Sequence, residues 1–260
     1  MGILNITLDS FSDGGLYLRK EDAIKKACQL EEQGAHVIDI GGESSRPNAK
    51  AISIKEELKR ILPVIKKLVK MINIPISVDT YKSEVARCAL EEGATLINDI
   101  YALRYDRKLA DVITKYNVPV ILMHMRGAPH NMQLDPQYKD VVKDIVVFLK
   151  ERINAAKTLG IKENNIIIDP GIGFGKTKEH NLEILNRLEE FKALNRPLMI
   201  GTSRKSFIGK VLSVDTDKRI FGTAASVAVS ILKGAHIIRV HDVGEMRDVA
   251  CLTDAIINYN

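Results

Sequence analysis

Acidic, amide and basic side chains stand at the ends of short β-branched runs throughout this sequence. Asp79, Asn98 and Asp169 each close one such run. Carboxylates and amides can hold a ligand through paired hydrogen bonds, whereas Lys, Arg and His can neutralise negative charge. One such residue could simply cap the helix that follows. The whole set predicts a ligand-binding site, and it continues through Asn5, Asp39, His124, Ser203, Arg204, Lys205, Arg239, His241 and Asp242.

The runs that carry these residues predict β-strands. The segments between them have helical spacing, as in Val141, Ile145, Leu149 and Ile153. Strict alternation of strand and helix indicates a parallel sheet, and eight units in a chain of this length favour a closed barrel. We predict a single (β/α)8 TIM barrel domain over residues 1–260, with strands at 3–7, 36–40, 75–79, 95–98, 119–124, 165–169, 197–202 and 235–240.

A barrel of this kind places its catalytic face at the carboxyl ends of the strands. The polar residues described above fall at that end. The segments after the first and second predicted strands, 8–19 and 41–52, are long and rich in Ser, Gly and Asp. Such composition is typical of active-site loops.

Composition excludes several other classes of protein. The chain has 260 residues, 45% of them hydrophobic, yet no apolar run approaches the ~18 residues that span a bilayer. Its first residues lack the features of a secretory signal. Cys28, Cys88 and Cys251 are odd in number and widely spaced, which favours reduced thiols. We expect a soluble cytoplasmic protein that has no membrane partner.

The net charge of +5 suits anionic ligands and is also compatible with nucleic acid. The basic residues form no dense arm, however, and only 5% of the residues are aromatic, which leaves little for base stacking. No second His or Glu stands at helical metal-pair spacing from His124. We expect neither nucleic-acid binding nor a structural zinc.

Eight segments together resemble the dihydropteroate synthase family, in the family's order and over essentially the whole chain. The first two are long: MGILNITLDSFSDGG at 1–15 and DIGGESSRP at 39–47. Leu8, Ser45 and Asn48 stand where the family usually has Pro, Thr and Gly. The other segments are SVDTYK at 77–82, INDI at 97–100, LMHMRG at 122–127, DPGIGFGK at 169–176, GTSRKSF at 201–207 and RVHDV at 239–243.

The resemblance implies a transferase of folate biosynthesis and a target of sulfonamides. The enzyme would join a pterin methyl pyrophosphate to 4-aminobenzoate, with Mg2+ bridging the phosphate oxygens, and would form a homodimer through its late helices. Its pterin site would consist of Asp79, Asn98, Asp169, Lys205 and Arg239.

The resemblance also implies the rest of the site. Asn5, Arg239 and His241 would bind the pyrophosphate, and Asn5 would also be the metal ligand. The catalytic residues would be Asp79, Lys205, Asp13 and Arg46, with Asp13 and Arg46 meeting between the two loops. The 4-aminobenzoate site would be formed by Phe11, Ser45, Arg46, Pro47 and Ser206.

Two alternatives remain at this point. A pterin-binding methyltransferase, which passes a methyl group from a reduced folate-type cofactor to a corrinoid protein, would share the barrel and the Asp and Asn contacts. It would not need the segment at 203–206 or the loop at 9–13. A non-catalytic pterin- or RNA-binding barrel is the alternative of a different class, and salt-sensitive retention of nucleic acid without turnover would favour it.

Overall fold

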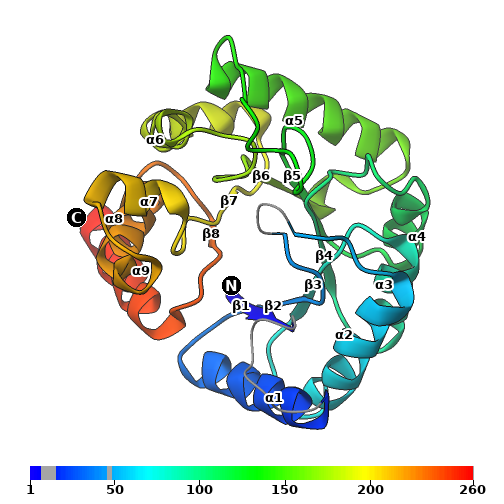
Figure 1. Cartoon of the computed structure of the whole chain (residues 1–260). Helices are drawn as coiled ribbons and strands as arrows, with labels where there is room; N and C mark the ends of the chain where they lie inside the picture. The colour runs from blue at the N-terminus through cyan, green and yellow to red at the C-terminus, as the bar shows by residue number, and fades with distance from the viewer. Residues whose placement is uncertain (7–15, 46–48, 260) are drawn as a thin grey trace.

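The fold is described by a computed structural model that covers residues 1–6, 16–45 and 49–259. All eight predicted strands are present and alternate with helices (Figure 1). The last two strands contain only two residues each and are shorter than predicted. The strands are β1 Gly2–Asn5, β2 Ile38–Gly41, β3 Ile76–Asp79, β4 Leu96–Asp99, β5 Val120–Met123, β6 Ile166–Asp169, β7 Met199–Ile200 and β8 Ile237–Ile238.

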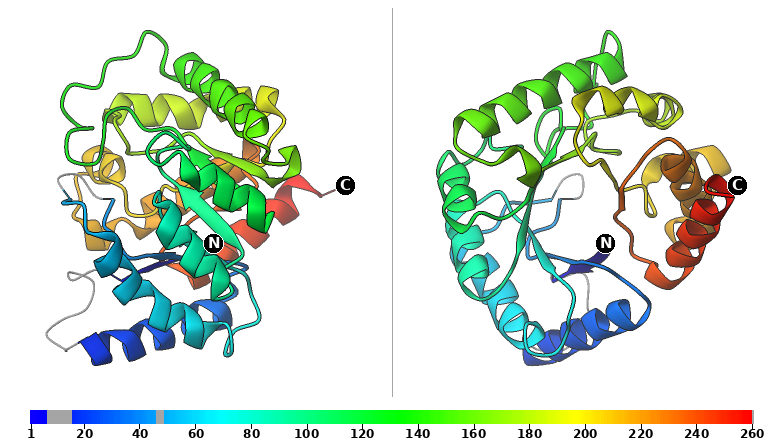
Figure 2. Two further views of the ribbon diagram at one scale, coloured as in Figure 1. Left: turned by 90° about the vertical axis from the view of Figure 1, so that its right-hand side faces the viewer. Right: turned by 180° about the vertical axis from the view of Figure 1, so that it is seen from behind.

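The strands are parallel and follow one another around a ring. Continuous ladders join β1 to β6 in sequence order, and β7 pairs with β8. Single parallel bridges, Ile168 with Leu198 and Gly2 with Val240, link the two sheets. The helices lie outside the strands (Figures 1 and 2). The chain therefore has the predicted α/β barrel fold.

Strand alternation separates an outer apolar layer from an inner layer that is apolar in the middle of the barrel and polar at its carboxyl end. Successive side chains of a strand point to opposite faces. In β4, Ile97 belongs to the main core against the helices, whereas Leu96 packs with Ile121 in a smaller cluster that contains one residue from each of four strands. Residues two positions after the inner apolar ones, such as Asn98 and Asp169, therefore reach the carboxyl end of the barrel.

Apolar helix faces complete the outer layer. Val141, Ile145, Leu149 and Ile153 are all buried, as their spacing predicts. The Asp140 carboxylate caps this helix by accepting hydrogen bonds from the Val142 and Lys143 backbone amides. The helices are α1 Leu16–Glu32, α2 Ile54–Leu68, α3 Ser83–Glu91, α4 Lys108–Tyr116, α5 Val141–Thr158, α6 Lys178–Asn186, α7 Ser206–Leu212, α8 Ile220–Leu232 and α9 Val243–Ile257.

The structure corrects one loop boundary. The first loop was predicted to extend to residue 19, but α1 already begins at Leu16, because its helical pattern continues toward the amino terminus. The second loop ends close to its predicted end at residue 52, since α2 begins after the Ser53 cap, although β2 includes Gly41 at the predicted start of the loop. Within the described residues no helix has the length and apolarity needed to cross a membrane. The three cysteines are free.

Candidate active site

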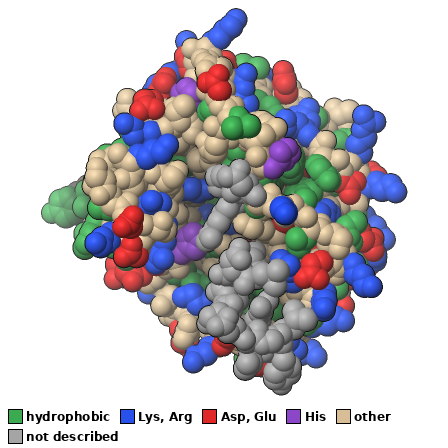
Figure 3. All heavy atoms as spheres, in the orientation of Figure 1, with side chains coloured by type: hydrophobic (Ala, Val, Ile, Leu, Met, Phe, Trp, Pro, Cys, Tyr) green, Lys and Arg blue, Asp and Glu red, His purple; other side chains and the backbone are tan. Residues whose placement is uncertain are grey.

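A pocket of about 560 Å³ opens at the carboxyl end of the barrel. Figure 3 looks onto this face, with Lys, Arg and His side chains around its centre. Four predicted site residues, Phe11, Asp13, Arg46 and Pro47, lie outside the described residues. The other nine all line the pocket: Asn5, Ser45, Asp79, Asn98, Asp169, Lys205, Ser206, Arg239 and His241.

A network of polar and charged groups from three strands and the segment after β8 lies on the pocket floor. Asp39 Oδ2 accepts from Asn98 Nδ2 at 3.0 Å and from Arg239 Nε at 2.6 Å. Arg239 Nη2 also donates to Asp79 Oδ2 at 3.0 Å. Sequence reasoning placed Asp39 in the polar set but gave it no role. The signal that could have assigned it a role is the alternation of side chains along β2, which points Asp39 inward. Asp39 is fully buried there.

Burial shifts the charge states of this network. It raises the pKa of Asp79 to about 7, against the opposing effect of the Arg239 guanidinium. Burial alone would lower the pKa of Arg239, but Asp39 and Asp79 outweigh it and raise that pKa. Burial, with Arg239 nearby, lowers the pKa of Lys205 to about 8. The floor therefore holds groups that can change charge near neutral pH.

The orientation of the Asn98 amide follows from its partner. A carboxylate can only accept, so the Asn98 NH2 group must face Asp39. The opposite atom, Asn98 Oδ1, is buried and has no hydrogen-bond partner among the described residues. A buried acceptor without a partner loses free energy, so this atom is suited to accept from a ligand N–H.

The segment after β6 forms a loop beside the pocket and does not begin a helix. Asp169 Oδ1 accepts from Gly171 N at 2.7 Å. Gly171 has φ of +69°, and a Cβ there would lie 2.0 Å from the His124 carbonyl oxygen, so only glycine fits. Burial raises the pKa of Asp169. Its carboxylate is thus held between a backbone amide and the pocket.

A buried lysine supports this loop from behind. Lys176 Nζ lies 3.0 Å from His124 Nδ1 and donates to the Phe174 carbonyl at 2.9 Å. Burial lowers the pKa of Lys176 to about 7 and that of His124 well below its usual value. His124 is therefore a packed, hydrogen-bonded histidine. Sequence reasoning missed Phe174, whose ring centroid lies 4.2 Å from Lys205 Nζ.

The corner after β8 holds His241 beside Arg239. Ser203 Oγ lies 3.0 Å from His241 Nδ1, and Ser203 Oγ accepts from the His241 amide at 3.2 Å. Burial and the Arg239 guanidinium lower the pKa of His241 to about 4. At neutral pH this ring is uncharged, so it can donate a hydrogen bond to an anion but adds no positive charge.

Asn5 completes this corner from β1. A Cβ placed on Gly41 would lie 3.4 Å from Asn5 Oδ1 and 3.8 Å from Asp79 Oδ2. The missing side chain of Gly41 thus leaves space beside two oxygen atoms. Among the described residues no group of three or more His, Cys, Asp or Glu could hold a metal ion, so a cation here would need ligands from a bound molecule.

Comparisons with known proteins agree on one family. The pterin binding enzyme family matches residues 1–241. Dihydropteroate synthase of Clostridium beijerinckii is 48% identical over 258 residues, covering 99% of this chain and 93% of that protein. Two Xanthomonas albilineans structures of the same enzyme each cover 100% of this chain and 93% of their own. One, with 4-aminobenzoic acid, has 42% identity and a TM-score of 0.94; the other, with 7,8-dihydropteroate, has 39% and 0.91.

These relatives are similar to this chain over nearly its whole length, and its barrel brings nine of the predicted site residues into one pocket. The chain is a transferase and belongs to the dihydropteroate synthase family of pterin-binding enzymes.

Proposed function

We propose that this enzyme condenses (7,8-dihydropterin-6-yl)methyl diphosphate with 4-aminobenzoate to give 7,8-dihydropteroate and diphosphate. The observation that carries the proposal is a single pocket lined by the carboxylates and amide of Asp79, Asn98 and Asp169 together with Arg239, His241 and Asn5. A ring rich in donors matches the carboxylates and the amide, and a diphosphate matches Arg239, His241 and Asn5.

The pterin would bind between β4, β6 and the segment after β7. Asp169 accepts from the exocyclic amine and the neighbouring ring nitrogen, and Asn98 Oδ1 accepts a further ring N–H. Lys205 donates to the ring carbonyl. The unpartnered Asn98 oxygen supports this orientation, and Asp79 and Arg239 lie against the same ring.

The diphosphate would lie at the corner formed by Asn5, Arg239 and His241. Mg2+ fits this corner because Asn5 offers one oxygen, and this ion usually takes one or two protein ligands beside phosphate oxygens and water. The ion would supply positive charge to the departing diphosphate. Arg239 and the neutral His241 would orient the phosphate oxygens by donating hydrogen bonds.

The second substrate would enter above the pterin. Ser45 and Ser206 line the outer part of the pocket. We assign Phe11, Arg46 and Pro47 to the same 4-aminobenzoate site, and a contact between Asp13 and Arg46 to the closed loops.

The free cysteines support a reducing, cytoplasmic location.

Turnover tests the proposed function directly. The enzyme is incubated with the pterin methyl diphosphate, 4-aminobenzoate and Mg2+, and mass spectrometry follows 7,8-dihydropteroate. We expect product, and its loss when a chelator removes Mg2+. Methyl transfer from a reduced folate to a corrinoid protein, without dihydropteroate formation, would instead favour the methyltransferase alternative.

We expect Asp169→Asn to weaken pterin binding by about 10- to 100-fold while the protein stays folded. The amide turns a donor toward a donor-rich ring edge, and an unpaired buried donor costs about 1–3 kcal/mol. Calorimetry with the pterin measures the loss. Asp106→Asn is the control, since Asp106 also accepts from backbone amides but lies away from the pocket. Unchanged affinity in folded Asp169→Asn would remove Asp169 from the pterin site.

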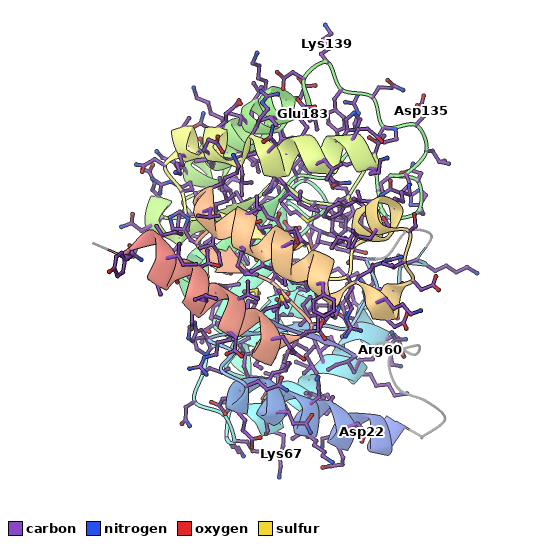
Figure 4. All side chains as sticks on the ribbon, turned by 90° about the vertical axis from the view of Figure 1, so that its left-hand side faces the viewer. Asp22, Arg60, Lys67, Asp135, Lys139 and Glu183 are labelled. Carbon is purple, nitrogen blue, oxygen red and sulfur yellow. The ribbon has the colours of Figure 1, made fainter. Side chains whose placement is uncertain are left out.

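An apolar surface on α8 and α9 supports a homodimer. Phe221 is 84% exposed, and Leu232, Leu252 and Ile256 are 58–65% exposed. Figure 4 shows the two helices side by side on one face of the molecule. Large exposed apolar patches mark interfaces between proteins, and closed two-fold pairs are the commonest homo-oligomers. We assign this face to a second copy of the chain.

Charge on this face should separate the two copies. We expect Phe221→Glu combined with Leu252→Glu to give monomers in light scattering at concentrations where the wild type is dimeric, because burying unpaired carboxylates is costly. Leu134→Glu is the matched control, since Leu134 is also exposed but lies elsewhere. A dimer that persists in the double variant would move the interface to another face.

A further inference from the structure

A buried ionic cluster lies between the second loop, α2 and the segment after β3. Lys82 Nζ contacts Glu43 Oε2 and Glu57 Oε2 at 2.6 Å each, and it donates to the Ile52 carbonyl oxygen at 2.8 Å. Lys82 is 7% exposed and Glu57 is 1% exposed. Glu43, Ile52, Glu57 and Lys82 are called the Lys82 clasp below. None of the four lines the pocket.

The clasp joins the two ends of the second loop. Glu43 Oε2, at the start of the loop, also accepts from the Ile52 backbone amide at 3.0 Å, near the loop's end. Glu43 Oε1 accepts from the Tyr81 hydroxyl at 2.6 Å. Both carboxylate oxygens of Glu43 therefore have hydrogen-bond partners, and Lys82 links both ends of the loop to the rest of the barrel.

The clasp also connects to the pocket wall on two sides. Ser44 and Ser45, which line the pocket, directly follow Glu43. Tyr81 packs in a buried cluster with Ile100 and Met132, which line the pocket as well. A shift of Glu43 would thus move the described start of the loop relative to the proposed pterin site.

We propose that the Lys82 clasp is a positioning device that fixes the second loop for 4-aminobenzoate and has little part in binding the pterin. This inference rests on the proposed function of the pocket. Desolvation offsets much of the attraction in a buried ion pair, so such a cluster adds little net stability. Its short, charge-assisted contacts nevertheless have narrow geometry, and geometry is what a substrate-binding loop requires.

Separate binding measurements for the two substrates test the clasp. Calorimetry gives the Kd of the pterin for the free protein, and then the Kd of 4-aminobenzoate for the protein loaded with pterin and diphosphate. For Lys82→Met and Glu43→Gln we expect the 4-aminobenzoate Kd to rise about tenfold or more, because small misplacements of binding groups weaken productive contacts strongly. The pterin Kd should stay within about twofold of the wild-type value.

Three further variants isolate the effect of the clasp. Tyr81→Phe removes one hydrogen bond to Glu43 and keeps the ring, so it replaces Lys82→Met if that protein does not fold. Lys82→Arg keeps the charge and should restore part of the 4-aminobenzoate affinity. Lys157→Met removes an exposed ion pair with Glu163 and should change neither Kd.

Two outcomes would overturn the clasp proposal: wild-type affinity for 4-aminobenzoate in the folded variants, or equal losses for both ligands. The proposed function fails on a different measurement, since it requires wild-type protein to form dihydropteroate. The binding experiment reports on the clasp whether or not turnover is observed.

Discussion

Arg239→Met is expected to lower the free energy of unfolding at pH 8 by about 3–5 kcal/mol, because it leaves two buried carboxylates without their shared cation. Arg239 contacts Asp39 at 2.6 Å and Asp79 at 3.0 Å, and Asp39 is fully buried. Methionine fills much of the same volume, so the expected loss comes from charge. Denaturant titration of wild type and variant measures it.

The deficit should depend on pH in a defined direction. The folded-state pKa of Asp79 is already raised to about 7, and loss of Arg239 raises it further. A raised carboxyl pKa favours the folded state most below the unfolded value of ~4, and this contribution is lost as pH rises through the folded value. The variant should therefore lie closer to wild type at pH 5 than at pH 8.

A surface arginine provides the control for this experiment. Arg87 also bridges two carboxylates, Glu84 and Glu91, but all three side chains are 38–48% exposed. Arg87→Met should cost no more than about 1 kcal/mol. An Arg239→Met deficit that is equally small, or equal at both pH values, would mean that the carboxylate network does not depend on Arg239.

The barrel could be predicted from sequence because its signals are local. Helical spacing in segments such as α5, and β-branched runs such as Ile166–Asp169, determine element type residue by residue. The short strands β7 and β8 were predicted too long, because propensity does not show where pairing with a neighbouring strand ends. Strand order then followed from the alternation of the elements.

The site was predictable as a set of residues but not as a network. Alternation of side chains along each strand points Asp79, Asn98 and Asp169 inward, and their places at the ends of the strands bring them to one end of the barrel. That Asp39 accepts from both Asn98 and Arg239 depends on contacts between residues up to 200 positions apart. The uncharged state of His241 depends on burial, which no single motif specifies. The Lys82 clasp could not be predicted from the sequence either, because it also depends on contacts between residues that are distant in the chain.

Asp79→Asn is expected to suppress cleavage of the bond between the pterin methylene and the diphosphate by on the order of 100-fold, as the loss of one preorganised electrostatic group can do. We expect this C–O bond to break largely before the amine attacks. The bonding electron pair leaves with the diphosphate, and the methylene cation disperses its charge into the dihydropterin ring. The 4-aminobenzoate nitrogen then bonds to the methylene and releases a proton.

The weakness of the nucleophile supports this order. An arylamine with a para carboxylate attacks poorly, and among the described pocket residues the one histidine, His241, donates toward the phosphate corner in the proposed arrangement. A cation that forms early and is stabilised by the enzyme can react even with such a weak nucleophile. Asp79 lies on the pocket floor beside the proposed pterin position, where a carboxylate favours a cationic ring over a neutral one. A protonated Asp79 gives no such help, so cleavage should quicken as pH rises toward 7.

Oxygen labelling can detect the cation without the second substrate. The pterin methyl diphosphate carries heavy oxygen at the bridging position, and 4-aminobenzoate is omitted. If cleavage is reversible while diphosphate stays bound, the label exchanges among the oxygens of the same phosphate, and NMR or mass spectrometry follows its movement. Wild type should scramble the label, and Asp79→Asn should scramble it about 100-fold more slowly, while calorimetry should show that the variant still binds the substrate. Retention of the label by wild type that turns over normally once 4-aminobenzoate is added would instead count against reversible ionisation and favour direct displacement by the amine, because only a cation that returns to the bound phosphate can exchange one of its oxygens for another.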